Sequence, residues 1–251
     1  MRIIKMLRQR LHREDIYSRA EFWDEKAREY DGSAISMWPN KSLNTLLHQD
    51  QVALIDRFMP DLRGRRVLEL GCGTGRITCV LAEKGAHVVG VDYSREAVAI
   101  AERATAPLGV TLRVQSVFEI NEDAYFDEVV AVSCLALACR NMDDLRAALT
   151  RCRKATVAEG GILLIEPFHR GFLHRTLNAG LVEVLSALRD AGYNVASVYH
   201  LAFWPTRLLL AFISWPEWFT TAFYRCGEAI LRLVLRNRMG GDYIAIRAFA
   251  V

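Results

Sequence analysis

The sequence predicts an α/β fold in which helices cover both faces of a doubly wound, mostly parallel sheet. Between residues 65 and 251, short apolar runs alternate with longer segments whose apolar residues recur every three or four positions. The short runs are rich in Val, Ile and Leu, as strands buried on both faces must be. Repeated strand–helix units produce this alternation. The 251 residues, 52% of them hydrophobic, are enough for one large core.

Each element can be placed from its pattern. Seven strands are expected, at residues 66–70, 87–91, 110–115, 127–132, 161–165, 194–203 and 242–250. Four helices are expected between them, at residues 76–84, 94–104, 142–155 and 173–191. Ser94 stands where a helix N-cap belongs, and Gly85 and Gly192 stand where helices end.

The N-terminal quarter differs from the rest because it shows no strand pattern and reads as helical. A connector containing Pro60 and Gly64 separates it from the first strand. We therefore expect a helical cap over residues 1–62 and an α/β domain over residues 63–251. A helical insertion at 204–239 precedes the last strand of that domain.

Charge and cysteine content exclude several classes of function. The 32 basic and 29 acidic residues leave a net charge of +3, which predicts no nucleic-acid partner. The six cysteines form no Cys-x-x-Cys pair and no zinc-ligand spacing, so we expect reduced thiols and no metal. The first residues lack the apolar run of a signal peptide, which predicts a cytoplasmic protein.

A glycine-rich turn follows the first predicted strand. Gly71, Gly73 and Gly75 let the chain turn tightly and bring its backbone close to a nucleotide-like ligand. The spacing is G-x-G-x-G, and Arg76 occupies the position where a dinucleotide-binding turn has its third glycine. Glu69 would repel a pyrophosphate but suits a cationic amino group or a sulfonium. The pattern thus favours a positively charged cofactor over NAD.

A second acidic residue ends the second predicted strand. Asp92 follows Gly71 by twenty-one residues, which in this topology brings its carboxylate to the crevice where a ribose presents its two hydroxyls. A phosphate-binding P-loop is excluded because no Gly-Lys-Ser/Thr follows the turn. Together the turn and the two acids predict a cofactor site.

At these residues the chain resembles a known family. ELGCGTG at 69–75 and VGVDYS at 89–94 are similar to motifs I and II of the class I S-adenosylmethionine-dependent methyltransferases, and the resemblance extends over residues 22–167. It implies S-adenosylmethionine as the cofactor and the strand order 3-2-1-4-5-7-6 with an antiparallel seventh strand. It also implies cofactor-binding roles for Gly71, Cys72, Gly73 and Asp92, and a covering role for an aromatic of the N-terminal helix, here Tyr30.

The rest of the predicted cofactor set departs from the family or extends it. Many relatives carry an Asp after strand three that accepts a hydrogen bond from the adenine amino group, and this chain has Val117 there. We expect the backbone of Val117 and Phe118 to read the adenine edge and their side chains to pack on the ring. Glu69, Tyr93 and Ser133 complete the set.

Catalytic candidates are few. Relatives with small acceptors often have two histidines after strand four, where this chain has Ala138 and Cys139. His169 follows strand five at the edge where such folds gather their reacting groups, so it is the candidate general base. A solvated loop histidine or a group that orients the acceptor is the equal alternative. His48 in the cap is a second candidate, for which an ordinary helix-surface histidine is the leading interpretation.

The segment 204–239 is dense in aromatic residues. Pro216, Glu217 and flanking arginines argue against a membrane-spanning helix. Three interpretations remain open: walls of an apolar acceptor pocket, a dimer interface, or a helix on a membrane surface. Trp38 could cover the cofactor or acceptor, although simple packing is the safer interpretation. The basic, amphipathic residues 2–13 add a route to an anionic membrane surface, with a solvated helix face as the leading alternative.

These observations predict a methyltransferase that modifies an O or N atom of a small, hydrophobic or lipid-linked molecule. The expected partners are that acceptor and, as open interpretations, a second copy of the chain and a membrane surface. Two alternatives remain: a dinucleotide-dependent oxidoreductase, which Glu69 and Arg76 disfavour, and a non-catalytic cofactor-binding module.

Overall fold

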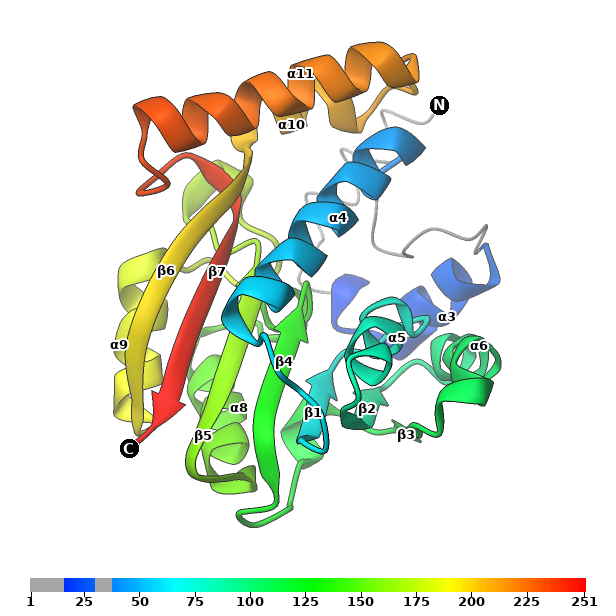
Figure 1. Cartoon of the computed structure of the whole chain (residues 1–251), viewed down its shortest axis with the longest axis vertical. Helices are drawn as coiled ribbons and strands as arrows, with labels where there is room; N and C mark the ends of the chain where they lie inside the picture. The colour runs from blue at the N-terminus through cyan, green and yellow to red at the C-terminus, as the bar shows by residue number, and fades with distance from the viewer. Residues whose placement is uncertain (1–15, 30–37) are drawn as a thin grey trace.

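The computed structural model describes residues 16–29 and 38–251, and its centre is one seven-stranded sheet (Figure 1). The strand order is β3-β2-β1-β4-β5-β7-β6, and only β7 runs antiparallel to its neighbours β5 and β6. The predicted fold class and strand order are thus confirmed. The strands are β1 (Arg66–Leu70), β2 (His87–Asp92), β3 (Thr111–Val114), β4 (Phe126–Val132), β5 (Thr156–Glu166), β6 (Tyr193–Phe203) and β7 (Gly241–Ala250).

Helices cover both faces of this sheet. They are α3 (Ala20–Arg28), α4 (Lys41–Phe58), α5 (Arg76–Glu83), α6 (Arg95–Thr105), α7 (Leu135–Ala138), α8 (Met142–Ala155), α9 (Leu181–Asp190), α10 (Trp204–Ala211) and α11 (Glu217–Ala229). Short turns of other helix types are η1 (Ala106–Leu108), η2 (Val117–Glu119), η3 (Gly171–Leu173) and η4 (Ile230–Val234). Ser94 is the N-cap of α6, as predicted, because its hydroxyl accepts from the Ala97 N–H at 3.1 Å.

The prediction of a helix over 173–191 was wrong at its first residues, because α9 begins only at Leu181. The N–H groups of Thr176 and Leu177 donate to the carbonyl of Ala136, both at 3.1 Å, which holds the preceding segment in a tertiary contact. Glu183 then accepts from the Gly180 N–H at 2.8 Å and fixes the first turn of α9. A hydrogen bond to a distant loop therefore outweighed the helical periodicity of this stretch.

Alternate residues of the strands enter two separate apolar cores. Val129 and Ala131 of β4 face the core covered by α8 and α9. Val130 and Val132 face the core covered by α4, α5, α10 and α11. This alternation is what a sheet buried on both faces requires.

The insertion before β7 lies across α4 and the ends of β6 and β7, as Figure 1 shows. Asn40, ahead of α4, donates to the Leu210 carbonyl at 3.1 Å and to the Thr220 hydroxyl at 3.0 Å. Tyr224 of α11 donates to Asp50 of α4 at 2.8 Å. No helix within the described ranges has both the length and the apolar character needed to cross a bilayer.

Candidate cofactor and acceptor site

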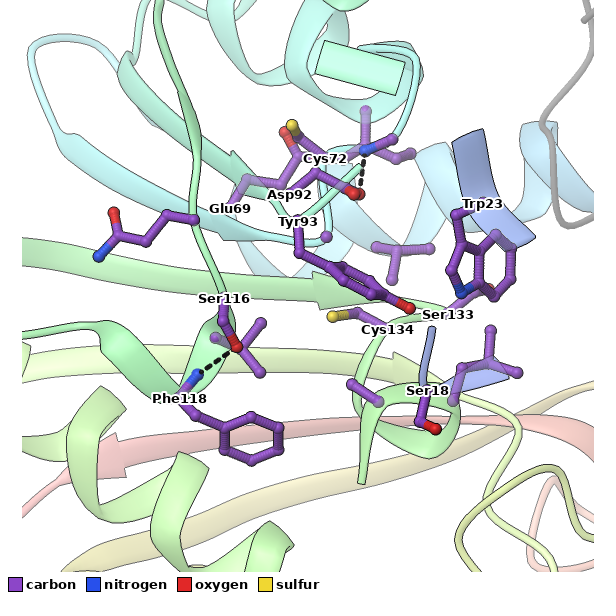
Figure 2. A pocket seen from close by; sticks show the side chains of 18 of the residues that line it. Ser18, Trp23, Glu69, Cys72, Asp92, Tyr93, Ser116, Phe118, Ser133 and Cys134 are labelled. Atoms are coloured by element: carbon purple, nitrogen blue, oxygen red, sulfur yellow. Dashed lines mark hydrogen bonds between the residues drawn. The ribbon is translucent and has the colours of Figure 1, made fainter. Parts of the chain in front are cut away.

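A cavity of about 470 Å³ opens at the carboxyl edge of β1, β2 and β4 (Figure 2). This is the edge at which doubly wound sheets bind their ligands. The turn after β1, the end of β2, η2 and the loop after β4 contribute its lining, and α3 closes one side. The predicted residues that line it are Glu69, Gly71, Cys72, Gly73, Asp92, Tyr93, Val117, Phe118 and Ser133.

The glycine turn is shaped for a close ligand. Gly71, Gly73 and Gly75 all have positive φ, at 66°, 53° and 84°. A Cβ at Gly71 would lie 2.6 Å from the Sγ of Cys134, so this glycine lets the turn pack against the loop after β4. A Cβ at Gly73 would meet no atom within 4 Å, because Gly73 borders the open cavity. The first glycine thus serves packing and the second serves ligand access.

Asp92 is fixed by backbone donors. Its Oδ2 accepts from the Gly73 N–H at 2.9 Å and its Oδ1 from the Ser94 N–H at 2.9 Å. Burial raises the pKa of Asp92, while these hydrogen bonds oppose the rise. Each carboxylate oxygen has a further acceptor site, so the group can receive two ligand hydroxyls from this one orientation.

Glu69 is the second acid of the cavity. Its Oε2 accepts from the Thr78 hydroxyl at 2.6 Å. Burial raises the pKa of Glu69 to about 8, and the hydrogen bond from Thr78 and the charge of Arg76 only partly offset this. A cation that enters the cavity would stabilise the ionised form of this buried carboxyl.

The residues expected at the adenine end are held by a small capping motif. Ser116 accepts from the Phe118 N–H at 3.3 Å, and Glu119 accepts from the Ser116 N–H at 3.1 Å. The Phe118 N–H is therefore already paired within the chain. The prediction of a backbone contact to adenine now rests on Val117, with both side chains available for packing on a ring.

Aromatic residues close the side of the cavity next to α3. Figure 2 shows the Tyr93 ring extending toward Trp23. The Tyr93 hydroxyl and the Trp23 Nε1 both donate to the Tyr17 carbonyl, each at 2.8 Å. Tyr30, the predicted covering aromatic, lies outside the described residues. Trp23 was missed, although its place in the family-like stretch that begins at Phe22 was a usable signal.

The loop after β4 is held by a buried acid. Glu166, at the end of β5, accepts from the N–H groups of Cys134, Leu135 and Ala136 at 2.8, 3.0 and 3.1 Å. Ser133 has a positive φ of 58°, and its hydroxyl donates to the Tyr243 hydroxyl at 3.2 Å. The loop therefore connects the cavity to β7.

His169 does not line the cavity. Its Nε2 lies 2.9 Å from the Asp242 carbonyl oxygen and 3.1 Å from Asp242 Oδ1. Both partners accept, so Nε2 carries a proton and a neutral ring has its lone pair on Nδ1. Asp242 is fully buried and also pairs with Arg175 at 3.1 Å and Arg207 at 2.5 Å, cations that help to hold its pKa below the usual range.

His48 and Trp38 also lie away from the cavity lining. His48 of α4 contacts Arg76 through Nδ1, and burial with the Arg76 charge lowers its pKa to about 4. Trp38 packs edge-on against Phe212 at 5.8 Å and lies under the guanidinium of Arg207, so it has a packing role in the described chain. Burial raises the pKa of Cys134 and Cys139 well above that of a free thiol, which disfavours nucleophilic chemistry there.

No group of three or more His, Cys, Asp and Glu side chains within the described ranges is arranged to hold a metal ion. A doubly wound sheet with a glycine turn and two acids at its carboxyl edge defines a binding protein for a nucleotide-type cofactor. Comparison with known proteins narrows this class. A family model described as "Methyltransferase domain" matches residues 67–161.

Curated relatives match the same region. The ubiquinone biosynthesis O-methyltransferase of Alkalilimnicola ehrlichii is 27% identical over 158 residues, which cover 61% of this chain and 63% of that protein. The magnesium-protoporphyrin O-methyltransferase of Rhodobacter capsulatus is 35% identical over 111 residues, which cover 42% of this chain and 47% of that protein. The matches thus span between 47% and 63% of these relatives' lengths.

A solved structure shares the fold. The S-adenosylmethionine dependent methyltransferase from Mesorhizobium loti superposes with a TM-score of 0.58 at 16% identity, covering 78% of this chain and 96% of that one. This likeness shows the fold of the class I S-adenosylmethionine-dependent methyltransferases, and the match to the methyltransferase-domain model covers residues 67–161 of this chain. The cofactor of this family is S-adenosylmethionine. The open face of Gly73 and the two buried acids fit its size and charge.

Proposed function

We propose that this chain transfers a methyl group from S-adenosylmethionine to an oxygen atom of a small molecule. The observation that carries the proposal is the convergence of Glu69, Gly73 and Asp92 on one cavity. The relatives named O-methyltransferases support an oxygen acceptor. When bound, S-adenosylmethionine supplies a methyl group that is already activated by its sulfonium.

Different residues of the cavity contact different parts of this cofactor. Asp92, kept in place by the Gly73 and Ser94 N–H groups, accepts from the ribose hydroxyls. Glu69 balances the positive charge of the methionine portion. Val117 and Phe118 pack on the adenine, and Trp23 with Tyr93 keeps water from the side next to α3.

The acceptor belongs beside the loop after β4. Leu137 and Ala138 line the cavity there and provide apolar contact, which supports a hydrophobic acceptor. Among the described residues that line the cavity, none comes from 204–239, so that segment is not its wall. The hydrophobic or lipid-linked character of the acceptor therefore rests on the loop and not on the aromatic insertion.

Removal of a proton from the acceptor hydroxyl needs a base or an acceptor that ionises by itself. We assign the base to His169, whose ring is oriented by Asp242 and whose Nδ1 has the free lone pair. Because His169 does not line the cavity, this role requires an acceptor that extends beyond the cavity toward His169. His48 is the weaker choice, because a pKa near 4 leaves little basicity at neutral pH. The link from Ser133 to Tyr243, next to Asp242, connects this group to the cavity.

The experiment has two stages. Calorimetry should show binding of S-adenosylmethionine and its demethylated product but no binding of NADH. Incubation with a metabolite or lipid extract and an isotopically labelled methyl donor should then yield a product whose mass carries the label. Binding of NADH instead would replace the proposal by the oxidoreductase alternative. Cofactor binding with no labelled product from any extract would leave a non-catalytic binding module.

A further inference from the structure

A second cavity lies away from the cofactor site, along the free edge of the sheet. It has a volume of about 580 Å³ and is bordered by β6, the end of α4 and the turn that follows η4. In Figure 1 this region is where the end of α11 passes over β6. Four arginines line it, Arg57, Arg232, Arg236 and Arg238, and we call it the arginine groove.

The charges of the arginine groove are not neutralised by the described part of the chain. None of the four arginines forms an ion pair with a described residue. Arg57 is held against the groove wall, with its guanidinium 5.2 Å from the centre of the Tyr199 ring. The nearby acid Glu228 instead accepts from the Phe203 N–H at 3.1 Å. Like charges gathered in one concavity repel each other unless an anion lies between them.

A buried polar side chain lines the same groove. His200 is 6% exposed, and neither of its ring nitrogens has a hydrogen-bond partner in the described chain. Buried polar groups are normally paired, so such an orphan requires an explanation. Arginines beside β6 could also keep this edge strand from pairing with a strand of another molecule. That role would not require a buried histidine without a hydrogen-bond partner. An oxyanion in the groove would satisfy both the arginines and His200.

The surroundings of the groove indicate where this anion comes from. Leu233 and Val234 are 76% and 71% exposed, and they lie between Arg232 and Arg236 in the sequence. Exposed aliphatic side chains interleaved with arginines are typical of a helix on an anionic membrane surface. A soluble phosphate compound would not require them, and they offer no stacking surface for nucleic-acid bases.

We propose that the arginine groove binds the phosphate of an anionic phospholipid headgroup, while Leu233 and Val234 enter the interface between headgroups and acyl chains. This proposal is independent of the methyltransferase activity. It would place the end of α11 on the membrane and leave the cofactor cavity at a different edge of the molecule. The N-terminal residues 2–13, expected from sequence to favour the same surface, lie outside the described residues.

The test is sedimentation of the full chain with vesicles of phosphatidylcholine alone or mixed with phosphatidylglycerol. The wild type should bind only the mixed vesicles, and added salt should weaken the binding. The triple variant R232Q/R236Q/R238Q should reduce the partition coefficient by roughly a hundredfold, since each arginine near an anionic surface contributes about a factor of five. The matched control R95Q/R103Q/R189Q removes three exposed arginines from α6 and α9 and should bind as the wild type does.

A second variant separates a membrane from a soluble anion. L233S/V234S should weaken vesicle binding but leave calorimetric binding of glycerol 3-phosphate unchanged. Circular dichroism melts show whether each variant is folded. Equal binding of pure phosphatidylcholine, wild-type binding by the folded triple variant, or equal loss in the control would overturn the proposal. So would glycerol 3-phosphate or single-stranded RNA binding at physiological salt without any vesicle binding.

Discussion

Asp92 accepts backbone hydrogen bonds with the same carboxylate that we propose binds the cofactor. Because its oxygens already accept from Gly73 and Ser94, a ligand meets a group whose position is fixed before binding. We expect Asp92→Ala to weaken binding of S-adenosylmethionine ten- to hundredfold, since a hydrogen bond to a charged group contributes about 1.5–3 kcal/mol. Calorimetry measures the change, and Asp61→Ala, which removes an exposed carboxylate, is the control. Unchanged affinity in the folded Asp92 variant would remove Asp92 from the site.

Glu69 should make cofactor binding depend on pH. Its pKa is raised to about 8 in the free protein, so the carboxyl holds a proton at pH 6. A cationic ligand favours the carboxylate, so binding below pH 8 releases this proton and affinity should rise from pH 6 toward pH 8, by up to about tenfold per unit. Calorimetry in two buffers of different ionisation heat counts the protons. Glu69→Gln should abolish this contribution, and an equal release in that variant would place the titration elsewhere.

At the scale of elements, Glu166 connects the end of β5 to the loop after β4. It accepts from three backbone N–H groups that lie 30 to 32 residues earlier in the sequence. We expect Glu166→Ala to lower the free energy of unfolding by about 3 kcal/mol, because buried donors lose their acceptor, and to weaken cofactor binding as the loop shifts. Urea denaturation measures the first effect. Glu166→Gln keeps one acceptor oxygen and should lose less; equal losses would mean that side-chain volume matters more than the hydrogen bonds.

The segment after β5 carries the proposed base. We expect His169→Gln to lower turnover by roughly a hundredfold or more while cofactor affinity stays the same, as removal of a general base does. Turnover with a labelled methyl donor and calorimetry give the two quantities. His174→Gln, which changes a half-buried histidine of the same segment that does not line the cavity, is the matched control. Full activity of the His169 variant would point to an acceptor that ionises by itself.

Sequence patterns predicted those parts of the molecule that depend on residues close together in the sequence. The strands β1 and β2, the glycine turn and the N-cap at Ser94 follow from periodicity and from residue types at adjacent positions. The start of α9 could not be predicted, because a hydrogen bond to Ala136 decides it. The partners of His48 and His169 were likewise hidden, since Arg76 and Asp242 lie far away in the sequence. Sequence reasoning predicted the cofactor cavity better than the acceptor side, which depends on contacts between distant loops.

At the scale of the whole molecule, α4 belongs to one of the two cores and is not a detached cap. Leu47 and Ile55 are fully buried with residues of β1, β4 and β5. We expect Leu47→Ala to lower the free energy of unfolding by about 2–5 kcal/mol and to shift one single transition. Fluorescence and circular dichroism should report the same midpoint in urea. Two separated transitions would instead describe residues 1–62 as an independently unfolding cap.

The place of β7 has a consequence for synthesis of the chain. This strand lies between β5 and β6, both of which leave the ribosome before it. Until residues 241–250 emerge, the facing edges of β5 and β6 have unpaired N–H and C=O groups, and the growing chain is exposed to wrong strand pairing. Asp242 and Tyr243, which connect His169 and Ser133 to the rest of the site, arrive with the same strand. Closure of the sheet and completion of the proposed acceptor side therefore happen together, when β7 emerges from the ribosome.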